Sequence, residues 1–337
     1  MKLLWALFMC GYTLIFPAQA MAHAREAMAL WAEKVAPALF PFMALFPVLT
    51  GEEALRAYKR LFGRGMERVF NLPSDFSAAV AIGFMAGTPA GAMAAQRALS
   101  DTDMRVPVRK VLALSLLASG ASPVFLVCSV GNGMLESAQK GLCMLICLWL
   151  SACIAAFITA RLPVFPENYE RVTVKGKNVH EGSGIFNSVS AVLNVCGYMV
   201  LFRVFTGWLP EWTRLFSEIS SGCAFAAENG REWLCAFACG FTGACAMTQN
   251  LAYYRFKARA ALMFVLLKAA SALLAAGLYS AFCRIPINWK EAVSKDTLYL
   301  GTCLALGLAA MICGYMLISI AKGAYYLRKA KNGKAYD

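Results

Sequence analysis

The stretch GFMAGTPAGA (83–92) places three glycines and one proline inside the apolar segment Phe76–Leu99. Two other apolar segments are interrupted in a similar way, Val35–Leu49 by three prolines and Trp233–Leu251 by two glycines. Lipid offers no hydrogen-bond partners, so a broken backbone at membrane depth survives only inside protein or beside a water-filled cavity. These interruptions predict an all-α polytopic membrane protein with broken or re-entrant helices.

The composition excludes an ordinary soluble enzyme. Of the 337 residues, 60% are hydrophobic and 15% are charged, whereas soluble domains have about 25% charged residues. The net charge is +13, from 32 Lys and Arg against 19 Asp and Glu. Because the basic residues stand in short clusters between apolar runs, they fit loops at an anionic membrane surface better than a nucleic-acid partner. We therefore expect the lipid bilayer, and no nucleic acid, among the partners.

Several uninterrupted apolar runs approach 20 residues, the length that crosses a bilayer. They are Lys110–Cys128, Gly141–Ala160, Phe186–Phe205, Ala260–Phe282 and Leu298–Ile320. With the interrupted segments they predict about eight spans, and therefore a multi-pass membrane protein. Between them, the basic stretch Glu52–Asn71 predicts an amphipathic helix along the membrane interface.

The N-terminal segment, residues 1–22, fits two interpretations. An apolar run follows Lys2, and the sequence Pro17-Ala18-Gln19-Ala20 imitates a signal-peptide cleavage site. We prefer a retained transmembrane helix over residues 3–21, and whether residues 1–20 are cleaved stays open. At the other end, the five basic residues between 322 and 334 favour a cytoplasmic C-terminus.

The two sides of a central polar linker, residues 161–184, resemble each other. We predict a first repeat at 23–160, a second repeat at 185–283, and a C-terminal helix with a basic tail at 284–337. Four segments match in order: 36–49 with 195–205, 87–91 with 218–222, 118–123 with 239–244, and 141–160 with 260–282. One small-residue motif alone is ordinary helix packing. Interrupted segments at corresponding places in two halves are typical of transporter binding sites.

Glu218 is the strongest single candidate for the solute-binding site. It lies in Leu215–Ala227, a mostly small and apolar stretch, and an ionisable group at membrane depth is by default a functional hypothesis. Its carboxylate could accept hydrogen bonds from a polar solute or carry a coupled proton or cation. The alternative is an interfacial glutamate near Arg214. Three neighbours could assist it, two with hydroxyls and one with a flexible backbone: Ser220, Ser221 and Gly222.

In the first half, Thr88 is the counterpart of Glu218. We expect the helix break around Thr88 to contribute exposed backbone dipoles and one hydroxyl to the site. The break also includes Gly87, Pro89 and Gly91. The alternative is a tight contact between helices. Other small or polar residues could complete the lining, although each hydroxyl can instead bond its own helix. They are Ser119, Ser122, Gly240, Thr242, Gly243, Thr248 and Gln249.

Two cations lie within apolar runs, Lys268 in the middle of one and Arg203 nearer the end of another. Either could face a cavity and offset an anionic cargo or Glu218. Either could instead extend to the interface from a tilted helix. Of the two, only Lys268 is included in the predicted site.

The sequence offers little material for catalysis or metal binding. The two histidines, His23 and His180, fall in polar connecting segments, and the thirteen cysteines include no C-x-x-C pair. Cysteines inside apolar runs are most simply packing residues. No G-x-x-x-x-G-K-[ST] motif is present, which argues against ATP-driven transport by this chain alone. We predict no catalytic residue, no metal site and no cofactor.

The order of motifs resembles a known family. PALFPF (37–42), FNLP (70–73), GFMAGTPAGA (83–92), EISSG (218–222) and GFTGACAMTQ (240–249) resemble motifs of the sporulation integral membrane proteins of the YlbJ type, within the nucleoside-recognition or Gate-domain superfamily. The resemblance covers about residues 12–283. This chain departs from the family in having Ala86 and Thr88 where a serine and a tyrosine are usual. It also has ASGASPVFLV (118–127) where the family commonly has asparagines before Pro-Leu-Phe.

The resemblance implies a polytopic protein related to nucleoside-type transporters and acting in endospore formation, in the outer forespore membrane. It also implies a small anionic metabolite as cargo, with dipicolinate the leading expectation. We therefore expect a secondary or facilitated transporter of a small polar or anionic solute, and not an enzyme. A nucleoside-type transporter, or a spore-envelope assembly protein without cargo, remains an alternative. A membrane-embedded enzyme, a further alternative, would need histidine or clustered carboxylates at membrane depth. Whether the protein forms a homo-oligomer stays open.

Overall fold

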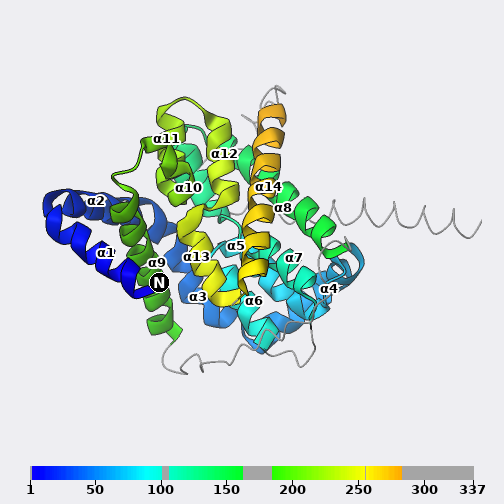
Figure 1. Cartoon of the computed structure of the whole chain (residues 1–337). Coiled ribbons are helices and arrows are strands. Elements are labelled where there is room, and N and C mark those ends of the chain that lie inside the picture. The colour runs from blue at the N-terminus through cyan, green and yellow to red at the C-terminus, as the bar shows by residue number, and fades with distance from the viewer. Residues whose placement is uncertain (1, 101–105, 162–183, 255, 283–337) are drawn as a thin grey trace, which may run out of the picture.

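The computed structural model describes residues 2–100, 106–161, 184–254 and 256–282 (Figure 1). Every regular element in these ranges is helical. Among the described residues, four helical segments are long and apolar enough to cross a membrane: Pro17–Leu49, Ala138–Arg161, Val189–Thr206 and Ala258–Phe282. A fifth is counted if the bent pair Glu52–Phe70 and Ser74–Ala86, which turns by 118°, is one span. The predicted all-α polytopic class is confirmed. The predicted span Leu298–Ile320 and the basic tail lie outside the described residues.

The N-terminal helices differ from the sequence prediction. Helix α1 (Lys2–Ile15) ends before Phe16, and α2 (Pro17–Leu30) continues through the π-helical turn η1 (Trp31–Val35) into α3 (Ala36–Leu49). The predicted helix over residues 3–21 is therefore divided. His23 lies within α2, so its assignment to a polar connecting segment was wrong.

The prolines of α3 do not break it, contrary to the prediction. One proline occupies its first turn, where the backbone N–H needs no partner within the helix. Pro41 and Pro47 lie inside α3, and the helix continues to Leu49. A proline removes one helical hydrogen bond, and neighbouring helices can stabilise the helix around it. Helix α3 packs against α9 (Gly184–Thr206), which gives it such a neighbour.

Besides the 118° bend between Glu52–Phe70 and Ser74–Ala86, the described residues of the first half contain two breaks inside predicted apolar segments. Helix α4 (Glu52–Phe70) is the predicted amphipathic helix, and η2 (Ser74–Phe76) leads into α5 (Ser77–Ala86) and α6 (Ala90–Ser100). The break between α5 and α6 confirms the interruption predicted from GFMAGTPAGA. Helix α7 (Val108–Ala118) is followed by the π-helix η3 (Phe125–Asn132) and α8 (Ala138–Arg161).

The predicted span Lys110–Cys128 is not one helix. Regular helical structure is absent over residues 119–122, between α7 and η3. The local sequence explains this, because Gly120 is flexible and the residue before Pro123 is disfavoured in the helical region. The small-residue motif at 118–123 is therefore a second break of the first half.

The second half also contains two breaks. After α9 come η4 (Glu211–Thr213), the short α10 (Arg214–Ser217) and α11 (Ile219–Glu228). Helices α12 (Glu232–Phe241) and α13 (Gly243–Tyr254) are separated at Thr242, and α14 (Ala258–Phe282) follows. The predicted interruptions at 218–222 and 240–243 thus coincide with helix ends. The predicted spans in α9 and α14 are confirmed as helices.

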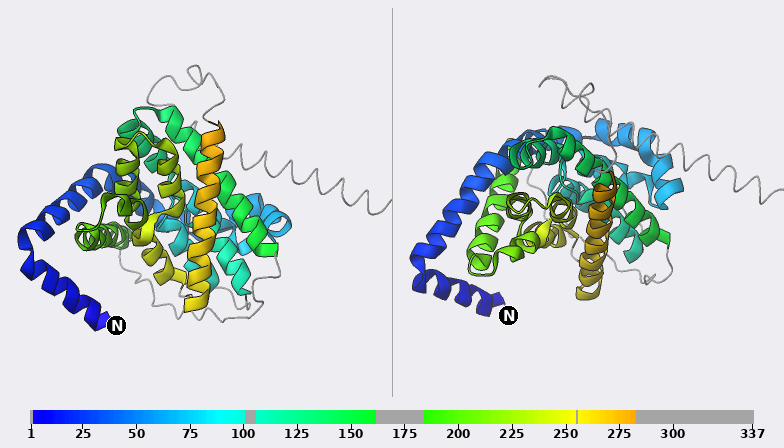
Figure 2. Two further views of the ribbon diagram at one scale, coloured as in Figure 1. Left: turned by 45° about the horizontal axis from the view of Figure 1, so that its top comes forward. Right: turned by 90° about the horizontal axis from the view of Figure 1, so that it is seen from above.

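The long helices enclose the broken ones. Helix α14 packs against α8 and α12, and α7 packs against α8 (Figure 1). Helix α2 lies at the edge of the molecule, beside α9, in both views of Figure 2. Two breaks occur in the same order on each side of the linker. The proposed repeat between the halves stays a prediction.

Candidate functional site

The two breaks of the first half lie against each other. The Thr88 backbone N–H donates to the Gly120 carbonyl oxygen at 2.8 Å. Gly87 has a φ of +71°, and a Cβ added there would lie 2.6 Å from the Ser122 nitrogen. Only glycine fits this close approach of two backbones. The first half therefore brings two interrupted helices together at one point.

The second half has the same arrangement. Gly243 has a φ of +69°, and a Cβ added there would lie 2.9 Å from the Glu218 Cα. Thr242, just before it, is left-handed with a φ of +64°. The break before α11 therefore contacts the break before α13. Each half thus contains one contacting pair of breaks.

Glu218 caps the N-terminus of α11. Its carboxylate accepts hydrogen bonds from the backbone N–H groups of Ser220 at 2.9 Å and Ser221 at 2.8 Å. The Glu218 residue is 5% exposed. A carboxylate at this position stabilises the helix and interacts favourably with its dipole. Arg214 instead pairs with Glu211, at 3.3 Å.

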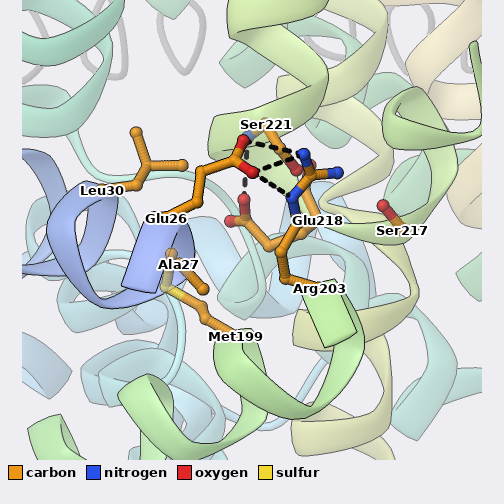
Figure 3. Close-up of a pocket in the computed structure, with 8 residues that line it drawn as sticks. All are labelled: Glu26, Ala27, Leu30, Met199, Arg203, Ser217, Glu218 and Ser221. Atoms are coloured by element: carbon orange, nitrogen blue, oxygen red, sulfur yellow. Dashed lines mark hydrogen bonds and ion pairs between the residues drawn. The ribbon is translucent and has the colours of Figure 1, made fainter. Parts of the chain in front are cut away.

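Glu218 also lines a small cavity (Figure 3). The cavity volume is about 10 Å³, which is room for one water molecule. The side chains around it come from α2, α9, α10 and α11. They are Glu26, Ala27, Leu30, Met199, Arg203, Ser217, Glu218 and Ser221. In this conformation the cavity holds no space for a metabolite.

A second polar cluster lies in the interior, around the breaks of the first half. Lys268 of α14 is 4% exposed, and its ammonium donates to the Ser119 carbonyl oxygen at 2.6 Å. The Ser119 hydroxyl lies 3.4 Å from the Tyr254 hydroxyl. Thr88 donates through its hydroxyl to the Asn250 side-chain oxygen at 2.6 Å. We call these five residues the interior polar cluster.

The interior polar cluster carries an uncompensated positive charge. Within the described ranges, Lys268 forms no ion pair with a carboxylate. The Asn250 side-chain nitrogen is likewise buried without a hydrogen-bond partner in the described part of the chain. Buried polar atoms are normally hydrogen-bonded. The cluster can therefore offer both a cation and a free N–H donor to an anion.

Helix α13 connects Glu218 with the interior polar cluster. Its first residue, Gly243, contacts Glu218, and its last turn supplies Asn250 and Tyr254 to the interior polar cluster. Gly243 and Asn250 are seven residue steps apart, which is about 10 Å at the rise of an α-helix. Helix α13 thus contacts Glu218 at its first residue and contributes two side chains to the interior polar cluster.

The other predicted site residues have mainly local roles. Ser122 accepts from the Phe125 backbone N–H at 3.2 Å, and the Gln249 amide contacts the Cys245 sulfur at 3.6 Å. The Ser220 hydroxyl is buried and unpartnered among the described residues, outside the cavity lining. The remaining ones form breaks or close helix contacts. They are Pro89, Gly91, Gly222, Gly240 and Thr242.

Sequence reasoning missed Glu26, Asn250 and Tyr254. Glu26 lies within a continuous apolar helix, but its neighbourhood reads as a polar connector when residues 23–34 are considered alone. A helical spacing of three and four residues places His23, Glu26 and Leu30 on one face. That spacing was the available signal. Asn250 and Tyr254 are four residues apart, and nothing in their local sequence indicates that both contact breaks of the first half.

The fold and its buried charges define a multi-pass integral membrane protein built of α-helices. The chain is similar to "Sporulation integral membrane protein YlbJ" of Bacillus subtilis (strain 168), with 23% identity over 242 residues. The match covers 64% of this chain and 58% of that protein, so the chain spans less than two thirds of its relative. The resemblance to the YlbJ type is confirmed as a distant homology. No family model matches the chain, and no solved structure matches it.

Proposed function

We propose that the protein is a secondary or facilitated transporter that moves a small anionic metabolite during endospore formation. Dipicolinate is the first candidate cargo, and the outer forespore membrane is the proposed location. The connection with sporulation rests on the similarity to YlbJ. The transport role rests on the interrupted helices and on the charges beside them.

The observation that carries the proposal is the contacting pair of helix breaks in each half. Such breaks gather backbone N–H and C=O groups that a solute or ion can bind. In this conformation the Thr88 N–H bonds the Gly120 carbonyl, and the Glu218 carboxylate occupies the N–H groups of α11, so cargo would replace these internal partners. Two breaks meet at Gly87 and Ser122, and two meet at Glu218 and Gly243. Paired breaks in two halves of one chain support a binding site between the halves, and therefore support the predicted repeat.

The charges support an anion as cargo. Lys268 is buried without a carboxylate partner among the described residues, and an anion would compensate its charge. Glu218, which contacts the first residue of α13, would repel that anion while ionised. A proton taken up by Glu218 together with the anion removes the repulsion, which makes proton-coupled uptake the expected mode. Because the cavity beside Glu218 holds only one water molecule, the helices must move to admit cargo.

The substitution Glu218→Gln tests this role in proteoliposomes. Glutamine keeps an oxygen for the cap of α11 but carries no titratable proton. We expect the initial rate of dipicolinate uptake under an inward proton gradient to fall about tenfold or more, equivalent to roughly 1.4 kcal/mol in the barrier. The matched control is Glu228→Gln, at the exposed C-terminal end of the same helix, which is expected to retain wild-type uptake.

Normal uptake by Glu218→Gln, with an unchanged response to the gradient, would exclude the proton-coupling role of this carboxylate. Equal losses in Glu218→Gln and Glu228→Gln would instead indicate damage to α11 as a whole. Size-exclusion chromatography of each variant in detergent separates folded protein from aggregated protein before reconstitution.

A further inference from the structure

Arg203 makes the most complete ion pair in the described part of the chain. Its guanidinium donates from Nε to one Glu26 oxygen at 3.0 Å, and from one terminal nitrogen to both oxygens, at 2.8 and 2.7 Å. Figure 3 shows the two side chains meeting beside Glu218. This is the fork-like geometry with which arginine recognises a carboxylate. Arg203 is thus already a formed carboxylate site, occupied by a side chain of the same protein.

The two partners differ sharply in exposure. The Arg203 side chain is 9% exposed, whereas the Glu26 side chain is 51% exposed. Arg203 belongs to α9, while Glu26 belongs to α2 at the edge of the molecule (Figure 2). A half-exposed carboxylate can return to water at small cost, but a buried guanidinium without a partner is expensive. When the pair separates, Glu26 can therefore leave, and Arg203 needs another anion.

The cavity beside Glu218 places this pair at the candidate site. Glu26 and Arg203 line it together with Ser217, Glu218 and Ser221. Helix α2 contributes three of the lining residues, so movement of α2 would enlarge the cavity and withdraw Glu26 from Arg203 together. The carboxylate that replaced Glu26 would enter from that side.

We propose that Arg203 is a specificity-determining residue for a carboxylate-bearing cargo, and that Glu26 occupies the place of the cargo carboxylate in the resting protein. Binding then exchanges one carboxylate for another on the same guanidinium, and the second carboxylate of a dicarboxylate adds one negative charge, which a proton on Glu218 would offset. This inference rests on the proposed function, because it names the residue and the chemical group by which the cargo is recognised.

The test is a binding measurement that does not require transport. Purified protein in phosphatidylcholine nanodiscs, which contain no anionic lipid, is titrated with pyridine-2,6-dicarboxylate by isothermal titration calorimetry. The neutral pyridine-2,6-dicarboxamide serves as the control ligand. The variants are Glu26→Gln, Arg203→Gln and Arg203→Lys. Glu33→Gln, an exposed glutamate further along the same continuous helix, is the matched control.

Removing the Glu26 carboxylate, which competes with the ligand for Arg203, should strengthen binding of the dicarboxylate. We expect Glu26→Gln to lower the Kd for the dicarboxylate about fivefold, since a half-exposed ion pair is a modest competitor. Arg203→Gln should raise the Kd at least about tenfold, and Arg203→Lys should fall between, because lysine keeps the charge without the fork. Glu33→Gln should match wild type, and no variant should change binding of the dicarboxamide.

An unchanged or higher Kd in Glu26→Gln would overturn the inference, and so would wild-type affinity in both Arg203 variants. Glutamine at position 26 keeps an oxygen that can accept from the buried Arg203 guanidinium, so Glu26→Gln serves as the decisive variant where Arg203→Gln is unstable, and size-exclusion chromatography checks its folding. If wild-type protein takes up the dicarboxylate into liposomes while these Kd values do not respond, the inference fails and the proposed function stands. Absence of both uptake and binding defeats the two together.

Discussion

Gly91 shows how closely the broken helices approach one another. A Cβ added there would lie 2.1 Å from the Ala118 carbonyl oxygen and 2.5 Å from the Gly83 Cα. Both obstacles are backbone atoms, which cannot move aside as a flexible side chain can. A single methyl group at this position would therefore push α6 away from α5 and α7.

We expect Gly91→Ala to destabilise the protein by about 1–3 kcal/mol or more, through overpacking. Thermal unfolding of the purified protein in detergent, followed by intrinsic fluorescence, measures the effect. The matched control is Gly277→Ala in α14, where an added Cβ meets nothing within 4 Å. Alanine favours a helix by about 1 kcal/mol over glycine, so the control should be at least as stable as wild type. Equal stability of the two variants would contradict the contact between α6 and α7.

Two residues show what the sequence could and could not indicate about the site. Glu218 was predicted because it interrupts a stretch of small residues, and it lies at a helix end as expected. Its hydrogen bonds to Ser220 and Ser221 are a local capping pattern, which short-range sequence can suggest. Its contact with Gly243, 25 residues further on, depends on tertiary structure and could not be predicted from either segment.

At the scale of elements, glycine predicted helix breaks better than proline did. The breaks at 87–89 and 242 coincide with glycines or neighbours of glycines that adopt positive φ. The three prolines of α3 leave the helix continuous. A proline costs one hydrogen bond, which packing against α9 can offset, whereas a positive φ takes the chain out of the helical conformation altogether.

The contact between α11 and α12 can be tested by a cysteine cross-link. The Cys223 and Cys239 sulfur atoms lie 3.3 Å apart, and both residues are fully buried. We expect the membrane-permeant oxidant diamide to accept two electrons and two protons from these thiols and to join them as a disulfide. Because Arg231 lies between them, tryptic cleavage there leaves two peptides held only by that bond.

Mass spectrometry of the non-reduced digest identifies the cross-linked peptides. Reduction should separate them, and Cys223→Ser should abolish the product. A disulfide from Cys223 to a cysteine outside α12 would contradict the packing of α11 on α12, whereas Cys235 lies on α12 as well. So would the persistence of both thiols under conditions that oxidise exposed Cys10.

At the scale of the whole molecule, composition and apolar periodicity were enough to predict a helical membrane protein. They also located the glycine-rich interruptions, because these follow from local backbone chemistry, but they wrongly predicted one at the prolines of α3. They could not show that the interruptions meet in pairs, or that α13 extends from Glu218 to the interior polar cluster. Those features depend on contacts between segments distant in sequence. The same reason explains why Glu26 was missed, since its partner lies 177 residues away.

The account of the whole molecule combines these features in one mechanism. Lys268 places positive charge in the interior polar cluster, and Arg203 places it at the cavity beside Glu218. Interrupted helices lie at both places, and Glu218 lies between the two cations in the sequence. The arrangement suits a solute that carries negative charge and enters with a proton. A nucleoside would need no such charge. A spore-envelope assembly protein would need no cargo.

The most direct test of transport is uptake by the wild-type protein in liposomes. Labelled dipicolinate and a panel of nucleosides are supplied separately, with and without an imposed inward proton gradient, and protein-free liposomes serve as the blank. The account predicts saturable dipicolinate uptake that the gradient accelerates, with little uptake of nucleosides. Uptake of nucleosides alone would contradict the anionic cargo. No uptake of any solute by folded protein would contradict the transport function itself.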